Sequence, residues 1–264
     1  MTGVQTCALP ILRVSRVALG TMTWRGDTDE HEARDILAAY YEAGGRLVDT
    51  ADVYADGAAE TLVGDLLRDF PEVLVSSKAG TVRGARRRDA SRGHLLATLD
   101  ASLRRLGRSH IDVWHVHAWD PHTPIEESLS AIDSAVASGK VRYAGVSNFA
   151  GWQAATAACG TRAIVSSQVE YSLLQRGIER EVLPAAEAHG LGIMAWSPLG
   201  RGVLTGKYRF ATPPDSRAAS QSYAPFVTPY LHERPRLITD AVCTAADGLG
   251  VDPAHVALAW VLAS

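Results

Sequence analysis

Short apolar runs alternate with amphipathic stretches along most of the chain. Seven runs are rich in β-branched and other apolar residues, as strands are: RVALGTM, RLVDTA, VLVSSKAG, IDVWHVH, VRYAGVSN, AIVSSQVEYS and LGIMAWSP. The stretches between them repeat apolar positions every three or four residues, which is the period of a helix with one buried face. Regular alternation of strand and helix predicts a parallel sheet covered by helices, and therefore an α/β protein.

Two of the predicted helices have clear boundaries. One covers residues 91–106, with leucines along one face and Gly107 after its end. Another begins at Thr123 and Pro124, where Thr123 and Glu126 have the spacing of a capping box and the proline suits a first helical position. Both boundaries are predictions of local structure.

Two further segments have a distinct composition. A third helix is expected to end at His189 and Gly190, with a basic residue in its last turn and glycine beyond it. Residues 209–235 contain five prolines and few apolar runs, which predicts a long loop. Long loops in compact domains are often functional, and we expect this one to cover a cofactor or a substrate.

Polar residues at the strand ends distinguish two kinds of parallel sheet. The carboxyl ends of six successive runs are marked by Asp49, Lys78, His117, Ser147, Gln168 and Trp196. A closed barrel brings such ends together at one mouth, whereas an open doubly wound sheet spreads them along an edge. The first strand–helix turn also lacks the GxGxxG pattern of dinucleotide-binding open sheets. The sequence therefore predicts an α/β fold of the (β/α)8 TIM barrel type, lacking the eighth strand and helix.

The two ends of the chain depart from this pattern. Residues 1–11, MTGVQTCALPI, do not have the regions of a secretory signal and look like a translated sequencing adapter, so we interpret them as an artefactual N-terminal extension. The other end stops at Ser264 inside an apolar helical pattern without a cap. We therefore expect residues 12–264 to be a single barrel domain that is incomplete at its C-terminus, so that the chain is a fragment.

Composition removes several classes of function. The net charge of −3 and the pI of about 6.3 give no general attraction to nucleic acid or to an anionic membrane. No apolar run reaches the ~18 residues of a membrane-spanning helix. Three cysteines, Cys7, Cys159 and Cys243, lie far apart and fit a reducing cytoplasm. The basic run at residues 83–92 is interpreted as a solvated loop.

Strand alternation directs a carboxylate, an ammonium and an imidazole toward the same mouth. Asp49, Lys78 and His117 are at inward-pointing positions, and Tyr54 follows Asp49 in the next loop. An ammonium beside a phenol stabilises the phenolate, so we expect Lys78 to lower the pKa of Tyr54 from its ordinary value near ~10. This set predicts a general acid for a carbonyl oxygen. The hydride must come from a nicotinamide, because no side chain donates one.

Six segments, in order and spacing, resemble the aldo-keto reductase superfamily. They are DTADVY (49–54), SSKAG with Lys78, IDVWHVH ending at His117, GVSNF (145–149), SQVEYS (167–172) and WSPLGRGVLTGKY (196–208). The last segment is similar to the bacterial branch that includes the potassium-channel beta subunits. The resemblance extends from Gly20 to the end of the chain and independently implies the barrel fold.

The resemblance also implies a role for each matching residue. Tyr54 would be the general acid–base, Lys78 would lower its pKa, Asp49 would pair with Lys78, and His117 would orient the carbonyl. Binding of NADP(H) would involve Thr21, Asp49, Ser147, Asn148, Gln168, Trp196, Ser197, Leu199, Gly200, Arg201 and Lys207. Within that set, the three residues Ser147, Asn148 and Gln168 would bind the carboxamide. Trp196 would stack on the nicotinamide ring, and the residues after it would line the pyrophosphate.

The expected function is reduction of a small-molecule aldehyde or ketone to an alcohol with NADPH, without a nucleic-acid or membrane partner. Two alternatives stay open. The resemblance to channel subunits suggests an NADP(H)-binding regulatory or redox-sensing subunit without significant turnover. His115 and His117 form an HxH pair, which some metal-dependent barrel hydrolases use. Such sites add histidines and an aspartate from later strands, so no metal is expected.

Overall fold

The computed structural model describes residues 12–82, 87–221 and 223–264, together with the backbone of residues 6–8. Residues 1–5, 9–11 and 83–86 lie outside this description, and with them most of the interpreted extension and part of the basic run. The chain divides into two compact units. The first comprises Met1–Gln168 and Glu181–Ile193, and the second Val169–Arg180 and Met194–Ser264. The single domain over residues 12–264 stays a prediction.

The sheet of the first unit is built from parallel strands in sequence order. These are β3 (Leu19–Gly20), β4 (Leu47–Asp49), β5 (Leu74–Ala79), β6 (Ile111–Val116), β7 (Val141–Ser147) and β8 (Ile164–Glu170), and β9 (Gly192–Trp196) comes next in the order. An open doubly wound sheet reverses its strand order at a switch point, whereas a barrel does not. The seven predicted strands and the barrel-type α/β fold are therefore confirmed. A separate antiparallel pair joins β1 (Thr6–Ala8) to β2 (Arg13–Ser15).

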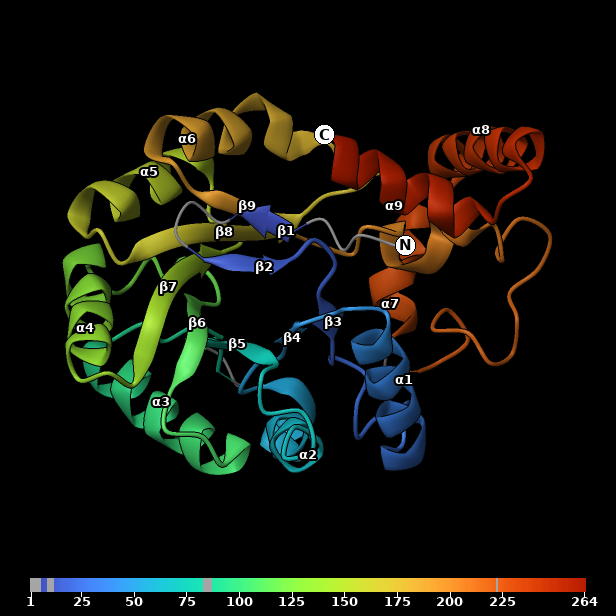
Figure 1. Ribbon diagram of the computed structural model, residues 1–264. Helices are drawn as coiled ribbons and strands as arrows, with labels where there is room; N and C mark the ends of the chain where they lie inside the picture. The colour runs from blue at the N-terminus through green and yellow to red at the C-terminus, as the bar shows by residue number, and fades with distance from the viewer. Residues whose placement is uncertain (1–5, 9–11, 83–86, 222) are drawn as a thin grey trace. The chain divides into compact units, whose positions relative to one another are not determined.

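Helices of the first unit cover the outer side of this sheet (Figure 1). They are α1 (Glu30–Glu42), α2 (Ala58–Leu66), α3 (Arg92–Leu106), α4 (Ile125–Ala137), α5 (Gly151–Gly160) and α6 (Val182–His189). Their apolar stripes are buried against the strands in one cluster, in which Leu62, Leu99 and Ile132 pack with Val75 and Trp114. Full burial of each such side chain contributes about 1.5–3 kcal/mol, so this layer holds the strand ends in register.

The predicted helix ends are correct in two of three cases. Helix α3 follows Ser91 and ends at Gly107, and α6 ends at Gly190; both glycines are left-handed. The capping box before α4 is wrong, because Pro124 is the N-cap and makes no side-chain cap bond. Thr123 instead donates its hydroxyl to Asp120 at 2.8 Å. This bond directs the Thr123 side chain toward Asp120, whereas in a capping box its oxygen would accept from a backbone N–H of the first helical turn.

The second unit consists mainly of helical segments. They are η2 (Gly177–Arg180), η3 (Gly200–Thr205), α7 (Ala224–Val227), η4 (Thr228–Tyr230), α8 (Glu233–Leu249) and α9 (Pro253–Ala263). The predicted loop at residues 209–235 is therefore wrong at residues 224–230 and 233–235, which are helical. Its prolines Pro225, Pro229 and Pro235 lie in first turns of helical segments, where a missing N–H removes no intrahelical bond. Across the described ranges, no helix combines the length and the apolar character needed to cross a membrane.

Candidate active site

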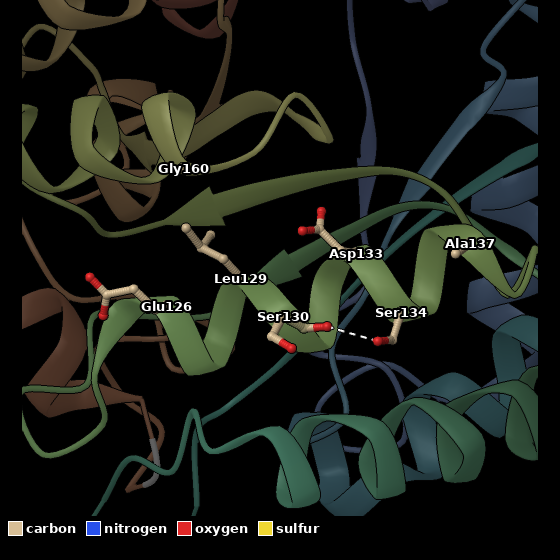
Figure 2. A pocket seen from close by; sticks show the side chains of 7 residues that line it. All are labelled: Glu126, Leu129, Ser130, Asp133, Ser134, Ala137 and Gly160. Carbon is tan, nitrogen blue, oxygen red and sulfur yellow. Dashed lines mark hydrogen bonds between the residues drawn. The ribbon is translucent and has the colours of Figure 1, made fainter.

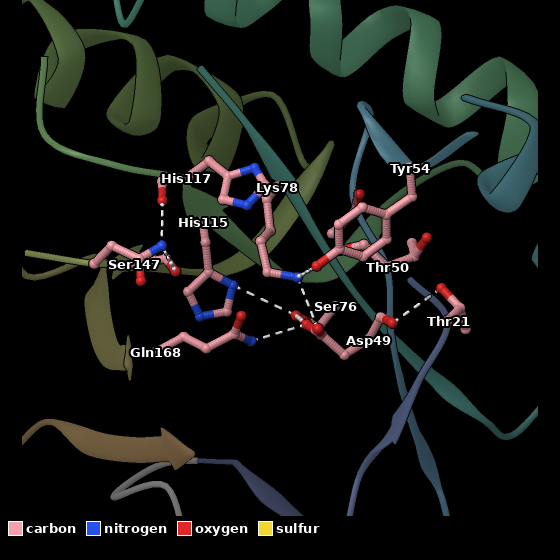
Figure 3. A network of polar contacts seen from close by, with 12 residues as sticks. Thr21, Asp49, Thr50, Tyr54, Ser76, Lys78, His115, His117, Ser147 and Gln168 are labelled. Carbon is pink, nitrogen blue, oxygen red and sulfur yellow. Dashed lines mark hydrogen bonds and ion pairs between the residues drawn. The ribbon is translucent and has the colours of Figure 1, made fainter. Parts of the chain in front are cut away.

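A buried ion pair joins two neighbouring strands of the first unit (Figure 3). Lys78 on β5 is 1% exposed, and its Nζ lies 2.7 Å from Asp49 Oδ2 and 2.8 Å from the carbonyl oxygen of Thr50. The other carboxylate oxygen, Asp49 Oδ1, accepts hydrogen bonds from Ser76 Oγ at 2.8 Å and Gln168 Nε2 at 2.9 Å. Buried charges are tolerated only when paired and hydrogen-bonded, and this pair is both.

The two partners keep each other ionised. Burial raises the pKa of Asp49, but the charge and hydrogen bond of Lys78 leave it below its ordinary value. Burial lowers the pKa of Lys78, but Asp49 and the Tyr54 phenol leave it above its ordinary value. The site therefore holds a fixed positive charge near neutral pH.

Tyr54 lies at the start of the turn η1 (Tyr54–Gly57), which follows β4 by a short loop. Its hydroxyl is 3.4 Å from Lys78 Nζ. Its ring meets the ring of His117 edge-on, with centroids 6.3 Å apart. The structure therefore brings together the four residues Asp49, Tyr54, Lys78 and His117, which we call the tetrad.

The pKa of Tyr54 corrects one expectation from the sequence. Burial raises this pKa, Lys78 lowers it, and Asp49 and Asp52 raise it again, so that it stands above its ordinary value. The predicted net lowering is wrong, because strand alternation reveals a neighbouring ammonium but not the loss of water around the phenol. At neutral pH the hydroxyl is protonated and is a potential proton donor.

His115 lies on β6 and His117 directly follows this strand, and the two histidines have different surroundings. Burial, followed by the charge of Lys78, lowers the pKa of His117 to about 3, so its imidazole is neutral. His117 Nδ1 is buried and has no hydrogen-bond partner among the described residues. His115 is fully buried, and its ring nitrogens face Ser166 Oγ at 3.0 Å and Ser76 Oγ at 3.4 Å. His115 is therefore a hydrogen-bonded interior histidine.

Amide and hydroxyl groups surround the tetrad at the ends of β7 and β8. Asn148 donates from Nδ2 to the carbonyl of His117 at 3.0 Å and to Ser147 Oγ at 3.1 Å. Gln168 is bonded to Asp49, as described above. Groups of this kind, together with the unpartnered His117 Nδ1, fit a ligand with its own amide and carbonyl oxygen. Thr21 donates from both its backbone N–H and its hydroxyl to the carbonyl of Asp49, at 3.0 and 3.1 Å.

The second unit contains the other residues expected to bind cofactor. Trp196 ends β9, and its ring stacks on Phe226 with centroids 6.3 Å apart. Arg201 makes a bidentate ion pair with Glu170, at 2.8 and 2.7 Å, and donates from Nη1 to the carbonyl of Phe226 at 2.6 Å. Phe226 belongs to the segment predicted to cover a ligand, so within this unit that segment contacts two of the expected cofactor residues.

The remaining expected residues of the second unit form a tight turn. Ser197, Gly200, Arg201 and Gly202 all have positive φ, between 51° and 93°. The backbone N–H of Gly200 donates to the carbonyl of Ser197 at 2.9 Å, which closes the turn over Leu199. Lys207 follows, with its Nζ 5.4 Å from the ring centroid of Tyr208.

Neither a surface hollow nor a metal centre provides an alternative site among the described residues. A hollow on the outer side of α4 is lined by Glu126, Leu129, Ser130, Asp133, Ser134, Ala137 and Gly160 (Figure 2). None of the expected site residues lines it, and it offers no imidazole or ammonium. In the part of the chain that the structure describes, no group of three or more His, Cys, Asp or Glu residues is arranged to hold a metal ion.

Comparison with known proteins identifies the family of the chain. The profile of the Aldo/keto reductase family matches residues 16–264. The chain belongs to the aldo/keto reductase family. It is 36% identical to the uncharacterized oxidoreductase YrpG of Bacillus subtilis, over 96% of this chain and 81% of that protein. It is 34% identical to a probable voltage-gated potassium channel subunit beta of Oryza sativa, over 94% of this chain and 80% of that protein.

A solved structure supports the same membership. The glycerol dehydrogenase of Gluconobacter oxydans superposes with a TM-score of 0.82 at 31% identity, covering 97% of this chain and 82% of that one. Together with the family match, these relatives support a carbonyl-reducing oxidoreductase in general. Members of this family generally use nicotinamide cofactors.

Sequence reasoning missed two polar residues near the tetrad. Ser76 binds Asp49, and its place two residues before Lys78 on the same strand face was a usable signal. Asp52 has a carboxylate oxygen that is buried without a hydrogen-bond partner among the described residues. Burial, followed by the charge of Glu60, raises the pKa of Asp52 to about 7. No strand or helix pattern predicts the burial of this carboxyl, because Asp52 lies in an irregular loop.

Proposed function

We propose that this aldo/keto reductase reduces an aldehyde or ketone to an alcohol with NADPH, and that Tyr54 is the proton donor. The observation that supports this most directly is the ammonium of Lys78, 1% exposed, paired with Asp49 at 2.7 Å and 3.4 Å from the Tyr54 hydroxyl. Such an ammonium stabilises the phenolate that remains after the phenol gives up its proton.

The residues of the tetrad would divide the work at the carbonyl oxygen. Tyr54 would donate the proton, and neutral His117 would hydrogen-bond the same oxygen and orient it. Asp49 would keep Lys78 charged and in place. A nicotinamide, when bound, would supply the hydride. Sequestration from water strengthens each of these electrostatic contributions.

Each unit contains residues that we assign to the cofactor. Ser147, Asn148 and Gln168, around the tetrad, have the donors and acceptors that a carboxamide needs. The family pattern assigns Trp196 to the nicotinamide ring, and Ser197, Leu199, Gly200, Arg201 and Lys207 to the pyrophosphate. Thr21, whose hydroxyl bonds the carbonyl of Asp49, completes the proposed set. Preference for NADPH over NADH is part of this proposal, as is a reducing cytoplasmic location, which the free thiols of Cys159 and Cys243 suit.

A single-turnover measurement tests the proposal. The chain loaded with NADPH is mixed with 4-nitrobenzaldehyde, and the loss of NADPH absorbance is followed. We expect oxidation of the bound NADPH, and we expect Tyr54→Phe to abolish it while NADPH still binds. A Tyr54→Phe chain that reduces the aldehyde at the parental rate would show that the roles are wrongly assigned.

A regulatory role is the second candidate. The similarity to the channel subunit of Oryza sativa motivates it, since a member of this family can be named for a partner protein instead of a substrate. In that case NADP(H) would be bound as a redox signal. Tight binding of NADPH with no oxidation by the aldehyde would favour this second candidate over turnover.

A further inference from the structure

The turn that follows Tyr54 has an unfavourable backbone. Ala55, Asp56 and Gly57 have φ angles of 46°, 55° and 88°. The left-handed region suits glycine but crowds the Cβ of other residues, and two of these three residues have one. Conformations of this kind persist only where the surrounding structure enforces them. The position of the Tyr54 phenol therefore depends on contacts made by its turn.

Arg105 of α3 provides one such contact. A Cβ built on Gly57 would lie 2.7 Å from Arg105 Nε and 2.8 Å from Arg105 Cδ, so the arginine side chain lies directly against the turn. No side chain other than hydrogen fits at Gly57 while Arg105 stays in place. The turn and the Arg105 side chain are thus packed directly against each other.

Arg105 is in turn fixed by a buried carboxylate. Glu60 of α2 is fully buried and accepts from Arg105 Nε at 2.7 Å, and its Oε2 lies 2.6 Å from Arg105 Nη2. Its other oxygen accepts the hydroxyl of Ser77 at 2.6 Å. Ser77 is the residue immediately before Lys78 on β5. One carboxylate therefore connects the turn of Tyr54 with the strand of Lys78, from the side opposite the tetrad.

An ion pair with a buried carboxylate is a poor way to gain stability. Removing the Glu60 charge from water offsets most of its attraction to Arg105, which is 29% exposed, and apolar side chains of similar size often stabilise a fold as well or better. What an ion pair with fixed hydrogen bonds does provide is direction, because a guanidinium and a carboxylate meet in a defined geometry.

We propose that the Glu60–Arg105 ion pair, with Ser77, is a positioning element that holds the Tyr54 hydroxyl against the Lys78 ammonium. It touches neither substrate nor cofactor and acts through the turn and the strand that it joins. The use of that contact for proton donation rests on the proposed function, but the contact itself does not.

A positioning role and a merely structural role differ in what they do to the phenol. Four groups face the Tyr54 hydroxyl or ring: Lys78, Asp49, Asp52 and His117. Among the three charged ones only Lys78 lowers the pKa of Tyr54. If the turn moves away from the strand, this lowering is lost and the phenol becomes less acidic. Loss of stability alone would leave the titration of a folded protein unchanged.

One indirect effect of removing the Arg105 charge has the opposite sign. Arg105 lowers the pKa of Asp52, so without it Asp52 is less ionised near neutral pH. Because ionised Asp52 raises the pKa of Tyr54, this route would make the phenol more acidic. Loss of a nearby positive charge by itself would make the phenol less acidic. Ser77→Ala removes no charge, so an upward shift in that variant reports the change in geometry.

The test uses a fluorinated tyrosine at position 54, whose phenol titrates at a pH where the protein is folded, observed by 19F NMR. We expect Arg105→Met to raise the pKa of that phenol by at least about one pH unit, which is a tenfold change in proton affinity. Arg105→Lys should recover part of the shift, and Ser77→Ala should give a smaller shift of the same sign. The matched control is Lys140→Met, which breaks the 2.7 Å ion pair with Asp100 on the same helix α3, and it should leave the titration unchanged.

Several outcomes would overturn the proposal. Folded Arg105→Met and Ser77→Ala chains that titrate as the parent does would do so, and so would an equal shift in Lys140→Met. If Arg105→Met does not fold, Ser77→Ala decides, because it removes one hydrogen bond and no charge. Where the parent reduces 4-nitrobenzaldehyde, Arg105→Met should also lower kcat about tenfold with little change in the KM for NADPH. A parent without reductase activity would defeat the proposed function, while the NMR titration would still decide the positioning role.

Discussion

The two units of the molecule each bury a carboxylate, a cation and a tyrosine, but they connect them differently. In the first unit the Tyr54 hydroxyl contacts the cation, 3.4 Å from Lys78 Nζ. In the second unit Tyr230 donates its hydroxyl to the carboxylate, 3.1 Å from Glu170 Oε1, while Arg201 donates to both oxygens of that carboxylate. We call Asp49, Lys78 and Tyr54 the first trio, and Glu170, Arg201 and Tyr230 the second trio. The phenol hydroxyl meets the cation in the first trio and the carboxylate in the second.

This order affects the acidity of the phenol. Burial and then Glu170 raise the pKa of Tyr230 to about 12, although Arg201 lowers it, so its hydroxyl stays protonated near neutral pH. Burial also raises the pKa of Tyr54, but Lys78 opposes the rise and stabilises the phenolate. Arg201 makes a bidentate pair with Glu170, donates to the carbonyl of Phe226 and lies 4.8 Å from the centroid of the Tyr230 ring. In the proposed mechanism, therefore, the cation must contact the phenol oxygen, as Lys78 does, and not only the ring.

Deleting the hydroxyl of Tyr54 and that of Tyr230 in turn should give the largest difference between the two trios. We expect Tyr54→Phe to lower carbonyl reduction by roughly 10²–10⁴-fold, the range that a general acid contributes, with NADPH binding retained. Tyr230→Phe is the matched control, and it should change the rate less than about threefold because its hydroxyl bonds Glu170 and Gln175 and is not a member of the tetrad. The measurement is the steady-state rate of NADPH oxidation with 4-nitrobenzaldehyde. Equal losses in the two variants would contradict the distinction between the trios.

Removing the cation of the first trio gives the next largest effect. Lys78→Met should lower the rate by about 10²-fold and move the pH–rate profile, because the phenolate loses its stabilising charge. It also leaves Asp49 buried without its partner, so some loss of stability is expected. The pH–rate profile of NADPH oxidation checks this. A profile with unchanged limbs would mean that Lys78 does not tune Tyr54.

Neutralising the carboxylate of the second trio should affect stability instead of chemistry. Glu170 and Arg201 have side chains only 12% and 15% exposed, so Glu170→Gln leaves a nearly buried guanidinium without its counter-charge. We expect a loss of about 2–3 kcal/mol in the free energy of unfolding, somewhat below the cost of deleting a buried partner, since glutamine keeps one acceptor. Urea denaturation measures it. Breaking the exposed Arg68–Asp65 pair by Asp65→Asn should cost less than about 1 kcal/mol.

The smallest effect concerns the pH dependence of stability in the first unit. Burial lowers the pKa of His115 to about 4 and of His117 to about 3, against ~6.5 in the unfolded chain. Unfolding in this interval takes up protons on both histidines, so their contribution stabilises above ~pH 6.5 and is lost as the pH falls. Asp52 has the opposite sign, because its pKa of about 7 exceeds ~3.9 in the unfolded chain. Its contribution is present at low pH and is lost as the pH rises toward 7.

Asp52→Asn should therefore make stability rise more steeply with pH. The expected change in slope is about 1 kcal/mol per pH unit between ~pH 4.5 and ~pH 6.5. The reason is that the variant no longer has the Asp52 carboxyl, whose titration opposes that of the two histidines. Urea denaturation at several pH values measures the slope. Asp65→Asn, which removes an exposed carboxyl on α2, serves as the control and should leave the slope as it is. A slope that flattens in Asp52→Asn would mean that this carboxyl is ionised throughout.

Much of the fold followed from local pattern. The seven strands, their sequential order and the ends of α3 and α6 were predictable, because period-two and period-3.6 patterns and C-terminal glycines report on neighbours a few residues away. The capping box at Thr123 was wrong because the helix begins one residue later, with Pro124 as its N-cap, and Thr123 bonds Asp120 in the preceding turn. The helical turns at the end of residues 209–235 were missed because prolines punctuate loops and also begin helices.

By itself the sequence determined which residues reach the mouth: alternation along each strand, with the family pattern, selected Asp49, Lys78 and His117, and Tyr54 in the loop beyond. Only the tertiary structure decided how acidic Tyr54 is, because water exclusion depends on everything packed around the phenol. It also decided that Glu60, Ser77 and Arg105 meet, since residues far apart in the chain become neighbours only when helices pack on the sheet. The sequence pattern indicates which face of a strand or helix a side chain occupies. The tertiary structure sets its distances to other groups and its exposure to water.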